Sequence, residues 1–236
     1  MAIKFWNLAS SSLASDVSDT ATSIDLSPLL LTLMFILRVT GEGEIFFPQN
    51  RVGRGGKDFK LYKFATMLKD SPNMGTGTVT VKNDPRVLPM GGFLRITKIN
   101  ELPQLINIFK GDMSVIGPRP QTKRCFDAFP RPAQKDIIKV RPGLSGIGSV
   151  VFRSEEDMMH ANAEPDRLYD DVIMPYKGKL ESWYVRNNSL WNYLLLIALT
   201  ILVILTRSTR LIFQYFSSLP RPPEDLNSFI ASDYYE

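Results

Sequence analysis

One segment, Ile96 to Pro120 with the sequence ITKINELPQLINIFKGDMSVIGPRP, constrains the fold of this 236-residue chain more than any other. Its apolar residues recur at the spacing of a single helical face, at Leu102, Leu105, Ile106 and Phe109. The spacing predicts a short amphipathic helix that begins at Asn100, a favourable N-cap, with Pro103 in its first turn. Gly111 is expected to end the helix because glycine tolerates positive φ. Glu101 would then lie at a helix N-terminus, where the macrodipole favours negative charge and phosphate binds readily.

The end of the same segment is a rigid turn, Gly117-Pro118-Arg119-Pro120. Two prolines fix the backbone around Arg119, so its guanidinium could meet a phosphate with little loss of entropy. Ordinary readings stand beside this one, because Asn100 and Glu101 also suit a plain helix cap and proline-flanked arginines are often surface residues. The residues alone leave both readings open.

The pattern along the rest of the chain predicts an α+β fold that is mainly helical. Residues 44–65 read as two short strands around a glycine turn, which gives a β-hairpin, and residues 70–92 read as an irregular loop. Residues 122–140 suggest a helix broken by Pro130 and Pro132, residues 141–146 a tight turn, and residues 157–189 further helix. The tail from residue 219 to 236, with three prolines and several acids, is expected to be disordered.

Composition excludes several classes of function. The only cysteine, Cys125, rules out an internal disulfide and suits a reducing compartment. The only histidine, His160, argues against a zinc site. A net charge of +4 suits an anionic membrane surface or a diphosphate, and the basic residues do not cluster with aromatic ones as nucleic-acid binding requires. No nucleic-acid partner is therefore expected.

The central segment resembles the bacterial sugar transferases, the small monotopic phosphoglycosyl transferases. The family motif runs roughly Asp-Glu-Leu-Pro-Gln-Leu, Asn, Lys-Gly-Asp-Met-Ser and Gly-Pro-Arg-Pro, and this chain matches it at Glu101–Leu105, Asn107, Lys110–Ser114 and Gly117–Pro120, with Asn100 at the position of the first Asp. The resemblance extends over roughly Gly41 to Leu190. It implies transfer of a sugar 1-phosphate from a UDP-sugar to undecaprenyl phosphate, the first membrane step of glycoconjugate synthesis, with Mg²⁺ as the cofactor. It also implies action at the cytoplasmic face of a bacterial inner membrane.

The resemblance assigns roles to particular residues. Glu101 and the position of Asn100 correspond to the catalytic acidic pair, and Glu101 with Asp112 would hold the magnesium ion. Several basic residues are candidates for binding the nucleotide diphosphate, because of the resemblance or because of their position. They are Arg51, Lys63, Arg86, Arg95, Arg119 and Arg141.

Two positions depart from the family pattern. Asn100 stands where the family has an Asp that attacks phosphorus, and a neutral amide cannot act as that nucleophile. Ala65 stands where the family usually has a basic residue. Three mechanisms therefore remain open: direct attack by the acceptor phosphate, attack by Glu101, or binding without turnover. The alternative function is thus a catalytically silent membrane-surface protein that binds nucleotide sugar or polyprenyl phosphate.

Two apolar segments bear on contact with a lipid membrane. The family has a membrane helix that turns back at a Ser-Pro break, and Ser27-Pro28 supplies the break here. The apolar part from Leu26 to Leu37 would be ~18 Å of helix against a hydrocarbon core of about 30 Å, so we expect shallow insertion. Leu190 to Thr206 is the most apolar run and, at 17 residues, is at the lower limit for spanning. A core helix or an interfacial helix is an equally fair reading of this run, and the resemblance to the family favours the interfacial one.

These expectations divide the chain into four parts. Residues 1–40 form an N-terminal membrane-associated segment, 41–189 the catalytic domain, 190–218 an apolar membrane-contacting helix, and 219–236 the tail. A homo-oligomer is left open.

Overall fold

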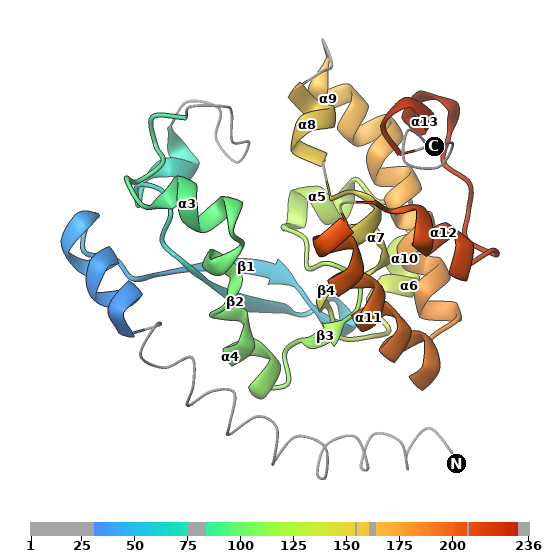
Figure 1. The fold of residues 1–236 in the computed structure, drawn as a ribbon, viewed down its shortest axis with the longest axis horizontal. Helices are drawn as coiled ribbons and strands as arrows, with labels where there is room; N and C mark the ends of the chain where they lie inside the picture. The colour runs from blue at the N-terminus through green and yellow to red at the C-terminus, as the bar shows by residue number, and fades with distance from the viewer. Residues whose placement is uncertain (1–30, 75–83, 154, 161–163, 207, 231–236) are drawn as a thin grey trace. The chain divides into compact units, whose positions relative to one another are not determined.

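The computed structural model describes residues 31–74, 84–153, 155–160, 164–206 and 208–230. The predicted Ser27-Pro28 break and the residues before it lie outside this part. The α+β expectation is confirmed, because many short helices accompany two small sheets (Figure 1). In chain order the elements are a helix over residues 31–40, β1 (Phe46–Val52), η1 (Arg54–Gly56), β2 (Asp58–Phe64), η2 (Ser71–Asn73), α3 (Gly91–Ile96), η3 (Ile99–Glu101), α4 (Gln104–Phe109), β3 (Ser114–Ile116), α5 (Lys123–Asp127), α6 (Arg131–Ile137), β4 (Gly143–Ser145), α7 (Ile147–Val151), α8 (Glu155–His160), α9 (Pro165–Leu168), the π-helical turn η4 (Tyr169–Ile173), α10 (Met174–Arg186), α11 (Leu190–Thr206), α12 (Arg210–Tyr215) and α13 (Glu224–Ile230).

The chain forms two compact units. Among the described residues, unit 1 comprises 31–47 and Phe64–Asn100, and unit 2 comprises Pro48–Lys63 and everything described from Glu101 onward. The predicted catalytic domain of residues 41–189 is therefore shared between both units, and the apolar segment after residue 189 belongs to unit 2.

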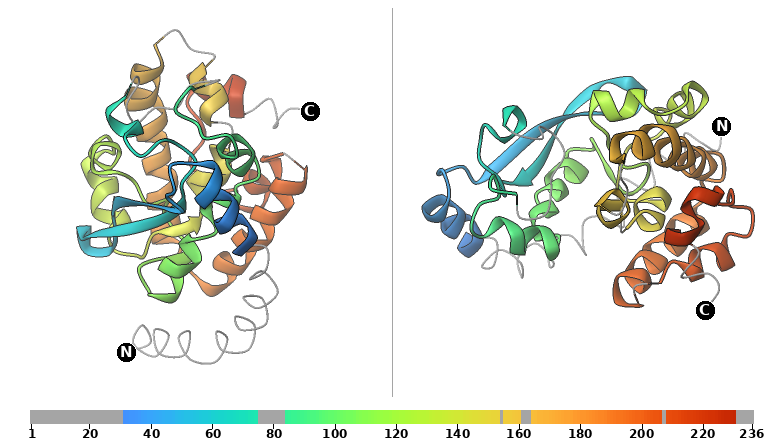
Figure 2. Two further views of the ribbon diagram at one scale, coloured as in Figure 1. Left: turned by 90° about the vertical axis from the view of Figure 1, so that its left-hand side faces the viewer. Right: turned by 90° about the horizontal axis from the view of Figure 1, so that it is seen from above.

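The predicted hairpin is present as β1 and β2, which pair with each other (Figure 2). Hydrogen bonds from Ala65 N to Ile45 O and from Gly53 N to Lys57 O fix an antiparallel register. Gly55 and Gly56 in the connection both have positive φ, which a side chain would disfavour. The glycine-rich turn thus closes the hairpin as its sequence predicts.

The helix predicted to start at Asn100 begins later. Asn100 lies in η3, and α4 starts at Gln104 with Pro103 in the N-cap position and no side-chain cap. The chain makes a separate 3-10 turn at Ile99–Glu101 before the α-helical bonds of α4 begin. The N-cap prediction for Asn100 is therefore wrong, whereas Gly111 does adopt a positive φ of 79° after the helix.

The turn predicted at residues 141–146 contains a strand. β4 pairs in parallel with β3, with Ser114 opposite Gly143 and Ile116 opposite Ser145. Glycines allow this approach, since a Cβ on Gly143 would lie 2.1 Å from Gly117 N and one on Gly146 would lie 2.1 Å from Gly117 O. The glycines therefore place the Gly117-Pro118-Arg119-Pro120 turn directly against the segment that follows Pro142.

Helices build the core of unit 2. The predicted break at Pro130 separates α5 from α6, and α6 packs on α10, the long orange helix of Figure 1. The larger apolar cluster joins α7, α10, α11 and α12 through side chains such as Ile147, Leu180 and Leu196. A smaller apolar cluster contains Phe129 and Ala133 together with Met174 of α10. The two clusters hold α10 in place, so its polar side chains are rigidly positioned.

Part of the tail predicted to be disordered is helical. α13 contributes Leu226 and Ile230, which are almost fully buried, to the larger apolar cluster. Burial of these two side chains stabilises a segment whose prolines, Pro220, Pro222 and Pro223, all precede the helix. The expectation of disorder is therefore wrong for Glu224–Ile230.

Candidate phosphate-binding site

The centre of the candidate site is an ion pair within unit 2. Arg119 Nη2 donates a hydrogen bond to Glu101 Oε1 at 2.8 Å, and Lys63 Nζ lies 3.8 Å from the same oxygen. The Glu101 side chain is only 15% exposed, so water screens these charges weakly. The Glu101 carboxylate raises the pKa of Arg119 despite the opposing effect of burial, so the guanidinium stays charged.

Arg51 adds a third positive charge. Its Nη2 donates to Gln49 Oε1 at 2.6 Å, while its buried Nε has no hydrogen-bond partner among the described residues. Burial, followed by repulsion from Arg119, lowers the pKa of Arg51 to about 10, which leaves it charged at neutral pH. Arg51, Lys63 and Arg119 against Glu101 give three positive charges and one negative charge. Such a cluster favours an anion with several negative oxygens.

The side chain of Asn107 ties α4 to the hairpin strand that carries Lys63. Its Oδ1 accepts from Tyr62 N at 3.0 Å, and its Nδ2 donates to Lys60 O at 2.8 Å. Asn107 is completely buried. The family motif contains Asn107 without giving it a role. The sequence signal for its structural role is its position on α4, where a polar side chain lies opposite Ile106 and Phe109.

Asn100 lies in η3, immediately before Glu101 in the chain. It is 9% exposed, and its Oδ1 has no hydrogen-bond partner in the part of the chain that the structure describes. Leaving a buried carbonyl oxygen unpaired costs about 1–3 kcal/mol, so this oxygen does not stabilise the fold. The side chain at this site is buried and neutral.

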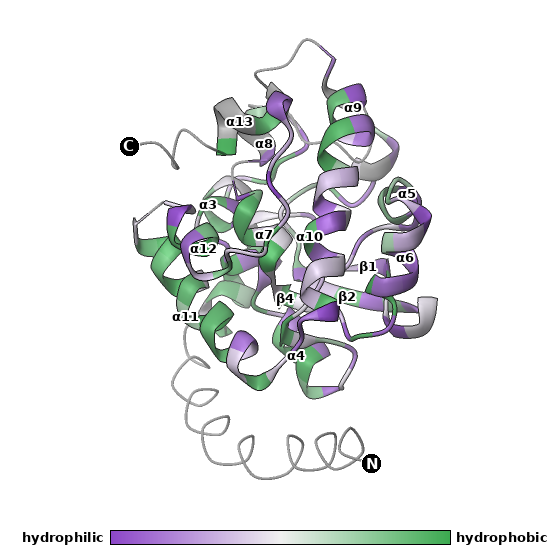
Figure 3. Ribbon diagram, turned by 90° about the vertical axis from the view of Figure 1, so that its right-hand side faces the viewer, coloured by the Kyte–Doolittle hydropathy of each residue, from purple (hydrophilic) through white to green (hydrophobic). Residues whose placement is uncertain are grey.

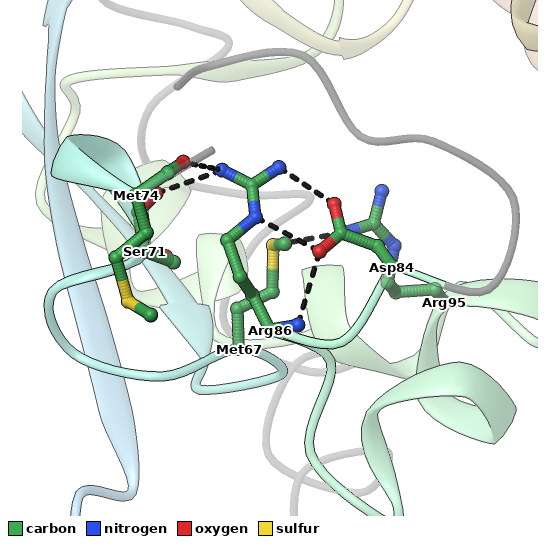
Figure 4. A network of polar contacts seen from close by, with 6 residues as sticks. All are labelled: Met67, Ser71, Met74, Asp84, Arg86 and Arg95. Atoms are coloured by element: carbon green, nitrogen blue, oxygen red, sulfur yellow. Dashed lines mark hydrogen bonds and ion pairs between the residues drawn. The ribbon is translucent and has the colours of Figure 1, made fainter. Parts of the chain in front are cut away.

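Arg86 and Arg95 lie in unit 1 (Figure 4). Arg86 binds both oxygens of Asp84, at 2.8 and 2.6 Å, and donates to the carbonyl oxygens of Ser71 and Met74. With its guanidinium almost fully buried in these contacts, Arg86 is better suited to holding the loop together than to binding a phosphate. Arg95 Nη1 lies 3.3 Å from Met67 Sδ.

Asp112 and Arg141 have other neighbours. Asp112 Oδ2 accepts from Asn107 Nδ2 at 3.4 Å, and Asp112 N donates to Asn107 O at 2.9 Å. The guanidinium of Arg141 lies beside Gly111, 3.8 Å from the place a Cβ would take there. The contacts of these two residues thus involve the turn after α4. Within the described ranges, no three His, Cys, Asp or Glu side chains gather to hold a metal.

Apolar side chains are exposed in both units. In unit 1 Leu31, Phe35 and Val39 share one face of the helix over residues 31–40. In unit 2 α4 exposes Phe109 at 64%, and α11 exposes Trp191 at 72% together with Leu194, Ile201, Ile204 and Leu205. Figure 3 shows the largely apolar composition of α11 in green. None of the helices described is both long and apolar enough to cross a membrane.

The fold is α+β, and its candidate site gathers three basic side chains around one buried carboxylate, an arrangement that suits an anionic ligand. Comparison with known proteins makes this specific: the chain belongs to the bacterial sugar transferase family, whose sequence pattern matches residues 11–207. Family membership confirms the resemblance carried by the central motif.

Several relatives have named activities. The chain is 37% identical over 182 residues to the UDP-N-acetylgalactosamine-undecaprenyl-phosphate N-acetylgalactosaminephosphotransferase of Aeromonas hydrophila, covering 76% of this chain and 40% of that protein. It is 32% identical over 195 residues to the undecaprenyl-phosphate galactose phosphotransferase of Salmonella typhimurium, covering 77% and 37%. It is 31% identical over 189 residues to the exopolysaccharide production protein ExoY of Rhizobium meliloti, covering 74% and 76%. The chain thus spans about two fifths of the length of the first two relatives.

Proposed function

We propose that this protein transfers a sugar 1-phosphate from a UDP-sugar to undecaprenyl phosphate, as the first membrane step in the synthesis of a polysaccharide or other glycoconjugate. One observation carries the proposal: Arg119 and Lys63 both contact Glu101, with Arg51 close enough to interact with both Arg119 and Glu101. The names of the Aeromonas and Salmonella relatives supply the donor and acceptor classes.

The three basic side chains would bind the donor diphosphate and stabilise the charge that develops during transfer. Phosphoryl transfer depends mainly on positioning and electrostatics, so a fixed guanidinium such as Arg119 is well suited to it. Arg119 is held at its side chain by Glu101 and at its backbone by the glycine-packed turn. Lys63 is held through the hairpin strand that Asn107 anchors.

Asn100 cannot provide an attacking carboxylate, and Oε1 of Glu101 is engaged by Arg119 and Lys63. We therefore favour direct attack. An oxygen of the acceptor phosphate forms a bond to the phosphorus that carries the sugar. The bond from that phosphorus to the bridging oxygen breaks, and UMP leaves with the electron pair. The positive side chains stabilise both the attacking and the leaving oxygens.

The candidate site offers one carboxylate, that of Glu101, that could hold a magnesium ion. Mg²⁺ in proteins is often held by one or two carboxylates together with substrate phosphates, and Glu101 offers one such carboxylate. When bound, the ion would neutralise diphosphate charge. The contacts of Asp112 with Asn107 favour a role in shaping the turn after α4 over a role as a second ligand.

The site of action is proposed to be the cytoplasmic face of the inner membrane. The exposed apolar side chains of α11 and α4, and of residues 31–40, suit shallow contact with lipid, where a polyprenyl phosphate presents its head group. A single cysteine suits the reducing side of that membrane.

The test is release of UMP by the purified protein in detergent with Mg²⁺, undecaprenyl phosphate and a panel of UDP-sugars. We expect turnover by the natural sequence, loss of at least about 100-fold in Glu101→Gln, and normal turnover in Glu164→Gln, an exposed acid paired with Arg167. Turnover only after Asn100→Asp would replace the proposal with a silent binding protein. Absence of turnover in both, with every sugar, would overturn it.

A further inference from the structure

Glu181 of α10 has a buried carboxyl group that lies close to the backbone of Arg119. Glu181 is 1% exposed, and Arg119 N donates a long hydrogen bond of 3.4 Å to its Oε1. Its Oε2 has no hydrogen-bond partner among the described residues. A carboxylate removed from water and given one long hydrogen bond is poorly stabilised in its charged form.

Few charged groups face Glu181, and most are engaged elsewhere. Lys177, one turn earlier on α10, is 2% exposed and directs its Nζ to Glu155 Oε2 at 2.7 Å. Tyr184, one turn later, directs its hydroxyl to Ile116 O at 3.4 Å. The backbone of α7 comes close to Glu181, because a Cβ on Gly148 would lie 2.4 Å from Glu181 Oε1.

α6 also packs on α10. α6 contributes Asp136, whose carboxylate binds Arg186 at 2.8 Å and Lys139 at 2.6 Å. The positive charges that lower the pKa of Glu181 are those of Lys177 and Arg119. The Glu155 carboxylate in turn raises the pKa of Arg119.

These surroundings explain the protonation of Glu181. Burial raises the pKa of Glu181 to about 7, and Lys177, the Arg119 backbone N–H and the Arg119 charge lower it less than burial raises it. Near neutral pH the carboxyl group therefore exchanges between its protonated and ionised forms, next to the backbone N–H of Arg119, whose guanidinium contacts Glu101.

We infer that Glu181 is a positioning residue for Arg119 and that its carboxyl group takes up a proton when an anionic ligand binds to the Arg119 guanidinium. The inference rests on the proposed function for the identity of that ligand, the diphosphate of a UDP-sugar. An ionised Glu181 attracts the Arg119 charge, and a bound diphosphate brings further negative charge to the same guanidinium. Protonation of Glu181 removes the repulsion between the two anions.

The linkage has a defined sign. Because the bound state favours the protonated carboxyl group, affinity rises as pH falls through 7. If binding raises the pKa of Glu181 by one unit, the affinity at pH 6 exceeds that at pH 8 by about fivefold, and several tenths of a proton are taken up per ligand near pH 7.5. The diphosphate of a nucleotide sugar does not titrate in this range.

The experiment measures binding of UDP-N-acetylgalactosamine to the full chain by calorimetry at pH 6 and 8, in buffers of different ionisation enthalpy. The number of protons taken up on binding is measured directly on the natural sequence, without a variant. In Glu181→Gln, whose amide oxygen can still accept from Arg119 N, we expect equal affinity at both pH values. Asp136→Asn, which also removes a buried carboxylate of unit 2, should keep the pH dependence.

Sulfate, a dianion at both pH values, is tested in parallel by thermal shift. Loss of pH dependence in Glu181→Gln with either ligand supports the inference. Equal pH dependence in Glu181→Gln and the natural sequence, or none in the natural sequence, overturns it. If sulfate gives the Glu181-dependent effect and the nucleotide sugar does not bind, the donor assignment fails and this inference stands. If neither ligand binds, the inference fails.

Discussion

Arg119 and Glu101, eighteen positions apart in the chain, form a contact of 2.8 Å that joins the turn after β3 to the end of η3. The pair is buried enough to be weakly screened, and Lys63 completes it from the hairpin. The geometry of this contact depends on the fork of donors that an arginine carries.

Replacing Arg119 by lysine keeps the charge and removes the fork. We expect Arg119→Lys to raise the KM for the UDP-sugar by about tenfold or more, because an ammonium lacks the planar fork with which a guanidinium bonds a carboxylate and a phosphate in a fixed geometry. Steady-state UMP release measures this. Arg124→Lys, at an exposed arginine 3.6 Å from Asp170, is the matched control and should leave KM unchanged. An equal effect in both variants would contradict a specific role for Arg119.

Removing the Asn107 side chain should destabilise unit 2. Asn107→Ala leaves Tyr62 N–H and Lys60 C=O without their partner, and we expect the free energy of unfolding to fall by about 2–4 kcal/mol. Denaturant unfolding measures the loss. Asn187→Ala, at an exposed asparagine that bonds only locally to Trp183 O, should change stability by less than about 0.5 kcal/mol. A loss of that small size in Asn107→Ala would show that the amide does not hold the hairpin.

Adding a methyl group at Gly143 should separate β4 from the Arg119 turn. A Cβ there would meet backbone at Gly117 N, which cannot move away as a flexible side chain can. We expect Gly143→Ala to cost about 3 kcal/mol or more and to weaken anion binding. Gly92→Ala, where a Cβ meets nothing within 4 Å, is the control for melting temperature. Similar melting temperatures for the two variants would argue against close backbone packing at Gly143.

The stability of the protein should depend on pH through Glu181. Because the folded-state pKa of about 7 is above the unfolded value of 4.5, Glu181 supports folding fully below pH 4.5 and loses that contribution as pH rises through 7. The free energy of unfolding of Glu181→Gln, taken relative to that of the natural sequence at the same pH, should therefore rise by about 1–3 kcal/mol from pH 4.5 to pH 8. Urea unfolding at the two pH values measures the difference. A constant difference across this range would indicate that Glu181 does not titrate in the folded state.

Direct attack predicts no release of UMP without acceptor. With undecaprenyl phosphate omitted, the protein should release much less than one UMP per chain, because no enzyme group accepts the phosphosugar. A rapid burst close to one UMP per chain would point instead to Glu101 as a nucleophile. Asn100→Asp serves as the positive comparison, since it restores a carboxylate at this position.

Local sequence patterns predicted the elements whose geometry is set locally. The hairpin follows from alternating residues around Gly55 and Gly56, and the break between α5 and α6 follows from Pro130. The positive φ of Gly111 likewise follows from its residue type. These features depend on backbone sterics within a few residues, so they can be recognised from the sequence.

Features that depend on distant packing could not be predicted. The strand at Gly143–Ser145 exists because Gly117 lies against it, and α13 is held by the burial of Leu226 and Ile230. Arg86 appeared free to bind phosphate, yet Asp84 and two carbonyl groups occupy its guanidinium. Glu181 is 62 positions from Arg119 and belongs to no motif, so only the fold brings them together.

The two sides of α4 face different surroundings. Gln104 and Asn107 point into the protein, while Ile106 and Phe109 are exposed on the opposite side of the same six-residue helix. An α-helix with its side chains is only about 10 Å across. Whatever medium surrounds Ile106 and Phe109 thus acts on the same short helix that anchors the hairpin, so the detergent chosen for purification is an experimental variable for every activity measured on this chain.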